Sequence, residues 1–254
     1  MQDLSRFLWK VRSAALSASL VLCLSAAPAF SQRPGERLRT EHFSMDVRGK
    51  VSRHTLARFT NAFDAEYDAV SSRVPLIVPG ELSLVLSFSA RPEPKPWESD
   101  EGIISLEPET IVVYARRDWE NSSSWRRAFD RELLRTILLP RLREGCPRWL
   151  IEGVALVFSG DSIADQLGEG AGNLRHLSDL DERLMLARKH DPGLQAVIVA
   201  TVMNLRMRFG DEAVFQLLRQ CSQSSFDSVT RMVLHEPLLD LESWWRLTLF
   251  HRPE

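Results

Sequence analysis

The spacing of apolar residues changes along this chain of 254 residues, and the change limits the folds available to it. Up to residue 118 the pattern predicts short strands and one helix, whereas from Ser124 onward a helical period of three to four residues dominates. A run of strands followed by a run of helices is typical of an α+β protein. We therefore predict a small mixed sheet with one helix over residues 30–118 and a mostly helical part over residues 119–254.

The first part contains one clear helix, from Ser52 to Val70, in which the apolar residues share one face and Ser52 is a suitable N-cap. A polar lead with Pro34 and Gly35 precedes the first strand, and the last two strands form a hairpin that turns near Pro108. The predicted strands are Glu41–Val47, Leu82–Phe88, Ile103–Leu106 and Thr110–Tyr114; the helices predicted after them are Ser124–Leu139, Pro147–Phe158, Asp179–Lys189, Leu194–Phe209, Asp211–Cys221, Ser225–Val233 and Leu241–Leu249.

Residues 1–29 have the three parts of a secretory signal peptide. Three basic residues precede the short apolar run Ala14–Leu24, and Ala27-Pro28-Ala29 indicates a cleavage region. Because this run is short for a bilayer span, an uncleaved anchor is the less favoured alternative. We expect a periplasmic or secreted protein that has no stable membrane anchor after signal cleavage.

Two cysteines follow the signal peptide, Cys146 and Cys221, and an exported protein meets conditions in which disulfides persist. They allow one pairing. The sequence does not show whether their Cα atoms come close enough to bond, so a disulfide and two free thiols both remain open.

The charge pattern excludes one class of partner. The net charge is −2, and the lysines and arginines are scattered, without the basic stripe interleaved with aromatic residues that is typical of nucleic-acid binding. We therefore predict no nucleic-acid partner. The sequence also lacks the G-x-S-x-G elbow, the phosphate-binding glycine loop and the C-x-x-C pair of other catalytic families.

Two neighbouring predicted helices carry the most specific pattern. The first contains Ala128–Arg135 (AFDRELLR) and is predicted to end early at Pro140, and the second contains Pro147–Ala155 (PRWLIEGVA). The pair resembles peptidase MA-like proteins of the gluzincin type, in which a helix with H-E-x-x-H is followed by a helix with Pro-x-Trp-Leu-x-Glu-Gly. The resemblance is clear in the second helix, degenerate in the first, and weaker over the rest of the chain. It implies a zincin-like fold.

In that family pattern two histidines bind zinc, the glutamate between them activates water, and a glutamate of the next helix completes the ligands. The resemblance gives Glu132 the general-base position and Glu152 the third-ligand position, whereas Arg131 and Arg135 replace both histidines. A guanidinium has no free lone pair for a metal and stays cationic. We predict that zinc is lost, that no cofactor is bound, and that the two arginines pair with the two glutamates.

Further residues are candidates for binding. Arg127 precedes Arg131 and Arg135 at four-residue steps, so the three form a basic stripe that either binds an anion or pairs with neighbouring glutamates. Trp149 is a candidate for which packing of the second helix is the stronger explanation. Trp97, in a proline-rich loop, is as typical of a contact surface as of a core anchor.

The sequence therefore predicts a pseudoenzyme: an exported peptidase-MA-like domain that binds a peptide, an envelope protein or a partner subunit through the former substrate cleft. The first alternative is a hydrolase with an unorthodox metal site or no metal. The second is a structural remnant with a filled cleft, whose function depends on an outer surface such as the loop that contains Trp97.

Overall fold

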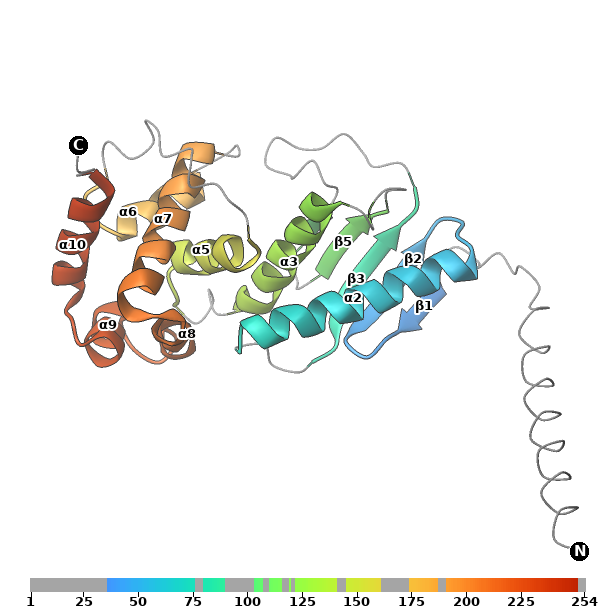
Figure 1. Ribbon diagram of the computed structural model, residues 1–254, viewed down its shortest axis with the longest axis horizontal. Coiled ribbons are helices and arrows are strands. Elements are labelled where there is room, and N and C mark those ends of the chain that lie inside the picture. The colour runs from blue at the N-terminus through green and yellow to red at the C-terminus, as the bar shows by residue number, and fades with distance from the viewer. Residues whose placement is uncertain are drawn as a thin grey trace, which may run out of the picture.

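The chain folds into a mixed α+β structure, with a small sheet towards one end and helices towards the other (Figure 1). It is a computed structural model that describes residues 36–75, 80–89, 103–106, 110–115, 119, 122–140, 145–160, 174–186 and 191–250. The predicted α+β class, with a mixed sheet first and helices after it, is confirmed.

The sheet has five strands in the order β1-β2-β3-β5-β4. Strands β2 (Phe43–Arg48), β3 (Leu82–Ser87) and β5 (Thr110–Tyr114) form a parallel centre. The edge strands β1 (Glu36–Arg39) and β4 (Ile103–Leu106) run antiparallel to their neighbours. The predicted hairpin of β4 and β5 is confirmed, and so are the predicted central strands.

Strand β1 was not predicted, because the polar lead was expected to continue up to Glu41. Its sequence is ERLR, and Arg37 and Arg39 are exposed while Leu38 is half-buried. A short, charged strand at a sheet edge is held by backbone hydrogen bonds to one neighbour, so it needs no apolar alternation. The pairing with β2, rather than the side-chain pattern, makes these residues a strand.

Helix α2 (Arg53–Arg73) lies across the sheet, as Figure 1 shows. The Ser52 Oγ accepts a hydrogen bond from the Thr55 N–H at 3.1 Å, which confirms the predicted N-cap. The apolar face is buried as predicted, and its rings stack on those of the next helix, with Phe63 and Phe129 centroids 4.9 Å apart. The buried residues of this face are Leu56, Phe59, Phe63, Tyr67 and Val70.

The helices of the second part are close to their predicted bounds. They are α3 (Ser123–Leu138), α5 (Arg148–Phe158), α6 (Ser178–Leu186), α7 (Pro192–Phe209), α8 (Asp211–Gln220), α9 (Phe226–Leu234) and α10 (Leu238–Phe250). Helix α3 stops two residues before Pro140, as predicted. It packs against α2, β4 and α5, and so connects the sheet to the other helices (Figure 1).

The core is one continuous cluster of buried side chains that runs from Phe43 in the sheet to Trp245 in α10. Helix α7 lies at the centre of the helical part and contacts α5, α6, α8 and α10. Trp245 is buried there and donates a hydrogen bond from Nε1 to the Thr201 Oγ1 at 2.8 Å.

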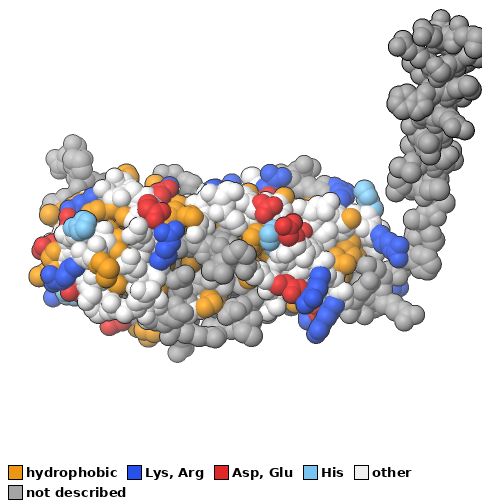
Figure 2. All heavy atoms as spheres, turned by 90° about the horizontal axis from the view of Figure 1, so that it is seen from below, with side chains coloured by type: hydrophobic (Ala, Val, Ile, Leu, Met, Phe, Trp, Pro, Cys, Tyr) orange, Lys and Arg blue, Asp and Glu red, His pale blue; other side chains and the backbone are white. Residues whose placement is uncertain are grey.

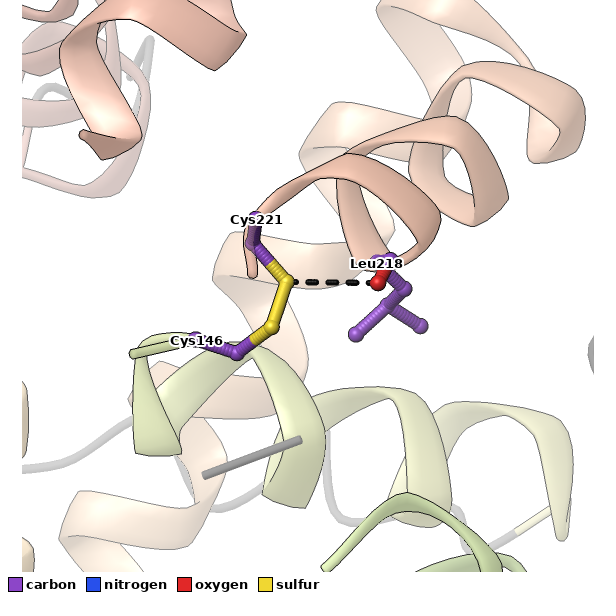
Figure 3. Close-up of a disulfide and its surroundings, with 3 residues drawn as sticks. All are labelled: Cys146, Leu218 and Cys221. Atoms are coloured by element: carbon purple, nitrogen blue, oxygen red, sulfur yellow. Dashed lines mark hydrogen bonds between the residues drawn. A yellow bond between two sulfur atoms is a disulfide. The ribbon is translucent and has the colours of Figure 1, made fainter. Parts of the chain in front are cut away.

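Of the two alternatives for the cysteines, a disulfide or two free thiols, the structure has the disulfide. It joins Cys146, just before α5, to Cys221, at the end of α8 (Figure 3). Their Cα atoms are 4.9 Å apart, and both residues are buried. The Sγ of Cys221 also lies 3.3 Å from the Leu218 carbonyl oxygen; because a disulfide sulfur carries no hydrogen, this is a packing contact. The disulfide ties the start of α5 to α8.

Several predictions fall on residues outside the described ranges: the signal peptide over residues 1–29, the loop with Trp97, and residues 187–190 at the end of the predicted helix Asp179–Lys189. Across the described part of the chain, none of the helices combines the length and apolar character that a membrane span requires. On the face in Figure 2, the coloured basic and acidic side chains are interspersed.

Candidate functional site

The site lies where α3 and α5 pack against each other. The Ser122 Oγ caps α3 by accepting a hydrogen bond from the Trp125 N–H at 3.1 Å. Trp125 and Phe129 then stack in the core on the side of α2, with Phe63 close to both rings. This packing fixes the rotation of α3 about its axis, and another side of the helix faces α5.

Arg135 joins the two helices by pairing with a carboxylate on each. Its Nη1 donates to both Glu132 carboxylate oxygens, at 3.1 Å to Oε1 and 3.2 Å to Oε2. Its Nη2 donates to the Glu152 Oε1 at 3.1 Å, and its Nε lies 3.0 Å from the Glu152 Oε2. One guanidinium therefore holds both carboxylates, and its Nη2 and Nε face the two oxygens of Glu152, the side-by-side arrangement that favours arginine–carboxylate pairs.

Two more arginines border this pair. The Arg131 Nε donates to the Glu132 Oε1 at 3.2 Å, and the Arg148 Nε lies 4.0 Å from the Glu152 Oε1. The expected ion pairs of Arg131 with Glu132, and of Arg135 with both glutamates, are therefore present. Two of the three arginines in the predicted basic stripe are engaged with carboxylates, which favours the paired interpretation over the anion-binding one.

Burial makes these ion pairs important to the fold. The Glu132 side chain is 4% exposed, that of Glu152 is 13% exposed and that of Arg135 is 31% exposed. The charge of Glu132, and then that of Glu152, raises the pKa of Arg135 above its already high usual value, so the guanidinium remains cationic. Removing it would leave a buried carboxylate with reduced compensation.

These residues do not fit a zinc site. A zinc ion bound by Glu152 would need further ligands that offer lone pairs, but the side chain between Glu152 and Glu132 is a guanidinium, which offers hydrogen-bond donors and a positive charge. Arg131, at the other position where the family pattern has a histidine, also points a guanidinium nitrogen at Glu132.

Helix α5 is held in place by neighbours that the sequence did not reveal. The Asp181 Oδ1, in α6, accepts a hydrogen bond from the Trp149 N–H at 2.7 Å and so caps the start of α5. Burial raises the pKa of Asp181, and hydrogen bonds from the backbone amides of Trp149 and Arg148 partly offset this rise. Trp149 is buried and meets the Phe226 ring edge to face at 5.9 Å, so it is a packing residue and offers no surface to a partner.

Gly153 allows α5 to approach α7. A Cβ at Gly153 would lie 2.4 Å from the Val202 Cγ2 and 3.0 Å from the Ile198 Cγ2, both on α7. This close packing explains why a glycine follows Glu152 in the second helix. It also brings the α5 backbone onto the buried central helix, which fixes the position of Glu152.

Replacing Gly153 by alanine is expected to destabilise the protein. The gain in helix propensity is about 1 kcal/mol, but overpacking of a core costs about 1–3 kcal/mol; because the Cβ would lie only 2.4 Å from the Val202 Cγ2, we expect the upper end of that cost and a net loss of up to about 2 kcal/mol. Urea unfolding of Gly153→Ala, Val202→Ala and the double variant measures it. In the Val202→Ala background, which lacks the methyl group in close contact, adding Gly153→Ala should cost much less than it does in the wild type. An equal cost in both backgrounds would mean that the close contact is not the cause.

Asp130 is a second residue that the sequence did not single out. It lies in α3, its side chain is 7% exposed, and its Oδ2 accepts a hydrogen bond from the Arg73 Nη2 at 2.5 Å. Burial raises the pKa of Asp130 to about 6, against the lowering effect of Arg73. Because the neutral form is favoured in the folded state, Asp130 contributes stability that is present below about pH 4 and lost as the pH rises through 6.

The predicted loss of the Asp130 contribution as the pH rises can be tested through the pH dependence of unfolding. The free energy of unfolding of the wild type, minus that of Asp130→Asn, should fall by about 2–3 kcal/mol between pH 4 and pH 7. Taking the difference cancels the titration of the other groups. Urea unfolding at four pH values in this range measures it, and a difference that is flat or rises with pH would show that Asp130 is not a buried acid of this kind.

No protein-family model, curated protein or solved structure matches this chain.

Proposed function

We propose that this chain is a peptidase-MA-like domain of the zincin type that has lost zinc and catalysis and now binds a peptide or an envelope protein. The observation that carries the proposal is the placement of Arg135 between Glu132 and Glu152. These are the two carboxylates that the resemblance assigns to water activation and metal binding, and they are brought together from separate helices. A tethered cation there connects the helices as a bound metal would.

The arrangement of the elements supports the same proposal. A mixed sheet with one covering helix is followed by the pair α3 and α5, and then by a helical tail, in the order that the resemblance implies. The disulfide between Cys146 and Cys221 supports export, because such bonds persist in oxidising compartments.

The chemistry of the site favours binding over hydrolysis. Peptide hydrolysis of the parent type needs a water molecule that a metal polarises and a free carboxylate that takes its proton. Here Glu132 accepts hydrogen bonds from two arginines, and Arg135 occupies the position between the carboxylates. A site that keeps its surrounding architecture but lacks these two groups can still hold a peptide without cleaving it.

The test uses the chain without residues 1–29 and a mixture of defined peptides. Mass spectrometry measures cleavage with and without added zinc and a chelator, and photo-crosslinking measures binding. We expect binding without cleavage, with Glu132→Gln behaving as the wild type in the cleavage assay. Chelator-sensitive cleavage that Glu132→Gln abolishes would establish the hydrolase alternative instead, and neither binding nor cleavage would favour the structural remnant.

A further inference from the structure

Three helices, α2, α3 and α5, meet at one arginine. Arg73 is the last residue of α2; its Nη2 donates to the Asp130 Oδ2 in α3, and its Nη1 donates to the carbonyl oxygen of Phe158, the last residue of α5, at 3.1 Å. The last carbonyls of a helix have no partner within the helix, so this contact satisfies one of them. Arg73 thus links the ends of α2 and α5 directly and also pairs with Asp130 of α3.

The junction is unevenly buried. The Asp130 carboxylate is almost completely enclosed, and its Oδ1 accepts no hydrogen bond from the described residues, whereas the Arg73 side chain is 44% exposed and can move into water. The other charged groups that face it are Glu66, on α2, and the exposed Arg126, on α3, whose Nε lies 3.4 Å from the Glu66 Oε1. Asp130 therefore supplies the charged contact of Arg73 at the junction, whereas its hydrogen bonds to the carbonyl oxygens of Phe158 and Ala69 are to neutral groups.

We propose that this junction is a proton-sensitive link: when Asp130 takes up a proton in mild acid, Arg73 leaves it and the ends of α2 and α5 come apart. A neutral carboxylic acid loses the charge–charge attraction for the guanidinium and keeps only a weaker hydrogen bond, and water solvates an exposed arginine well. Since α5 also carries Glu152, the position of the site helix becomes responsive to pH. This inference does not depend on the proposed loss of catalysis.

Two properties distinguish such a link from acid unfolding. Protonation of a group whose pKa burial has raised to about 6 does not lower the global stability, so the fold persists while the two helix ends loosen. The loosening is local, because the disulfide and the Asp181 cap hold the other end of α5. Local opening of this kind is visible in amide hydrogen exchange.

The experiment compares hydrogen exchange at pH 5 and pH 7.5 in the chain without residues 1–29, corrected for intrinsic exchange rates. In the wild type, protection in the last turns of α2 and α5 should fall roughly tenfold at pH 5, the effect of losing a charged hydrogen bond. Asp130→Asn, which imitates the protonated acid, should show the low protection at both pH values. Asp181→Asn, a matched change of a buried acid at the other end of α5, should keep the wild-type response.

Equal protection of these two turns at both pH values in the wild type would overturn the proposal, whether or not the variants fold. So would wild-type protection at pH 7.5 in Asp130→Asn, because Arg73 would then hold the junction without the charge. Loss of protection throughout the chain at pH 5 would also overturn it, since that result means global unfolding.

Discussion

Replacing Cys146 and Cys221 together by alanine is expected to lower the free energy of unfolding by about 4 kcal/mol. The two residues are 75 positions apart, so the disulfide closes a long loop. Closing such a loop restricts the unfolded chain more than it restricts the folded chain. The bond also fixes the start of α5, which positions Glu152.

Urea unfolding of the oxidised wild type and the Cys146→Ala, Cys221→Ala variant measures this loss. As a control, the wild type is unfolded and refolded in a reducing agent, which breaks the disulfide. Its free energy of unfolding should then fall to that of the variant, whereas the same treatment should leave the variant's value unchanged. Because both cysteines are buried, the native disulfide should resist a reducing agent until the protein unfolds. Equal urea midpoints for the oxidised wild type and the variant would contradict the account.

Replacing Arg135 by alanine should cost about 3 kcal/mol. The reason is less the loss of attraction than the two carboxylates that remain, because Glu132 is 4% exposed and an uncompensated buried charge is strongly destabilising. Arg131 and Arg148 still lie near the two glutamates, which keeps the expected loss at the lower end of the range for such pairs.

A matched control is available on the same helix. Arg126 is exposed and pairs with Glu66, so Arg126→Ala should cost less than about 1 kcal/mol. Combining Arg135→Ala with Glu152→Ala should recover part of the loss, since the second change removes one of the unpaired carboxylates. If Arg135→Ala cost no more than Arg126→Ala, Arg135 would not be the link between α3 and α5.

The elements that the sequence predicted are those with strong local patterns. The five apolar residues of α2 recur on one face, and the β4–β5 hairpin is marked by two apolar runs around Pro108, so neighbours in sequence suffice to define both. Strand β1 was missed because its order comes from backbone pairing with β2, which no side-chain pattern records.

The candidate site could be predicted in part for a similar reason. The ion pair of Arg135 with Glu152 was expected because the resemblance places the two helices side by side. Two other contacts depend on tertiary packing and could not be predicted. Asp181 caps α5 from a position 32 residues beyond Trp149, and Arg73 pairs with Asp130 across 57 residues of sequence. The disulfide stayed open because residue spacing alone gives no distance between two Cα atoms.

The most direct test of the central claim, that arginines occupy a degenerate zinc site, is the metal content of the purified chain without residues 1–29. Elemental analysis should find no zinc in the wild type and close to one equivalent in an Arg131→His, Arg135→His variant, in which two imidazoles and Glu152 supply a ligand set. Stoichiometric zinc in the wild type, or none in a folded double variant, would contradict the account.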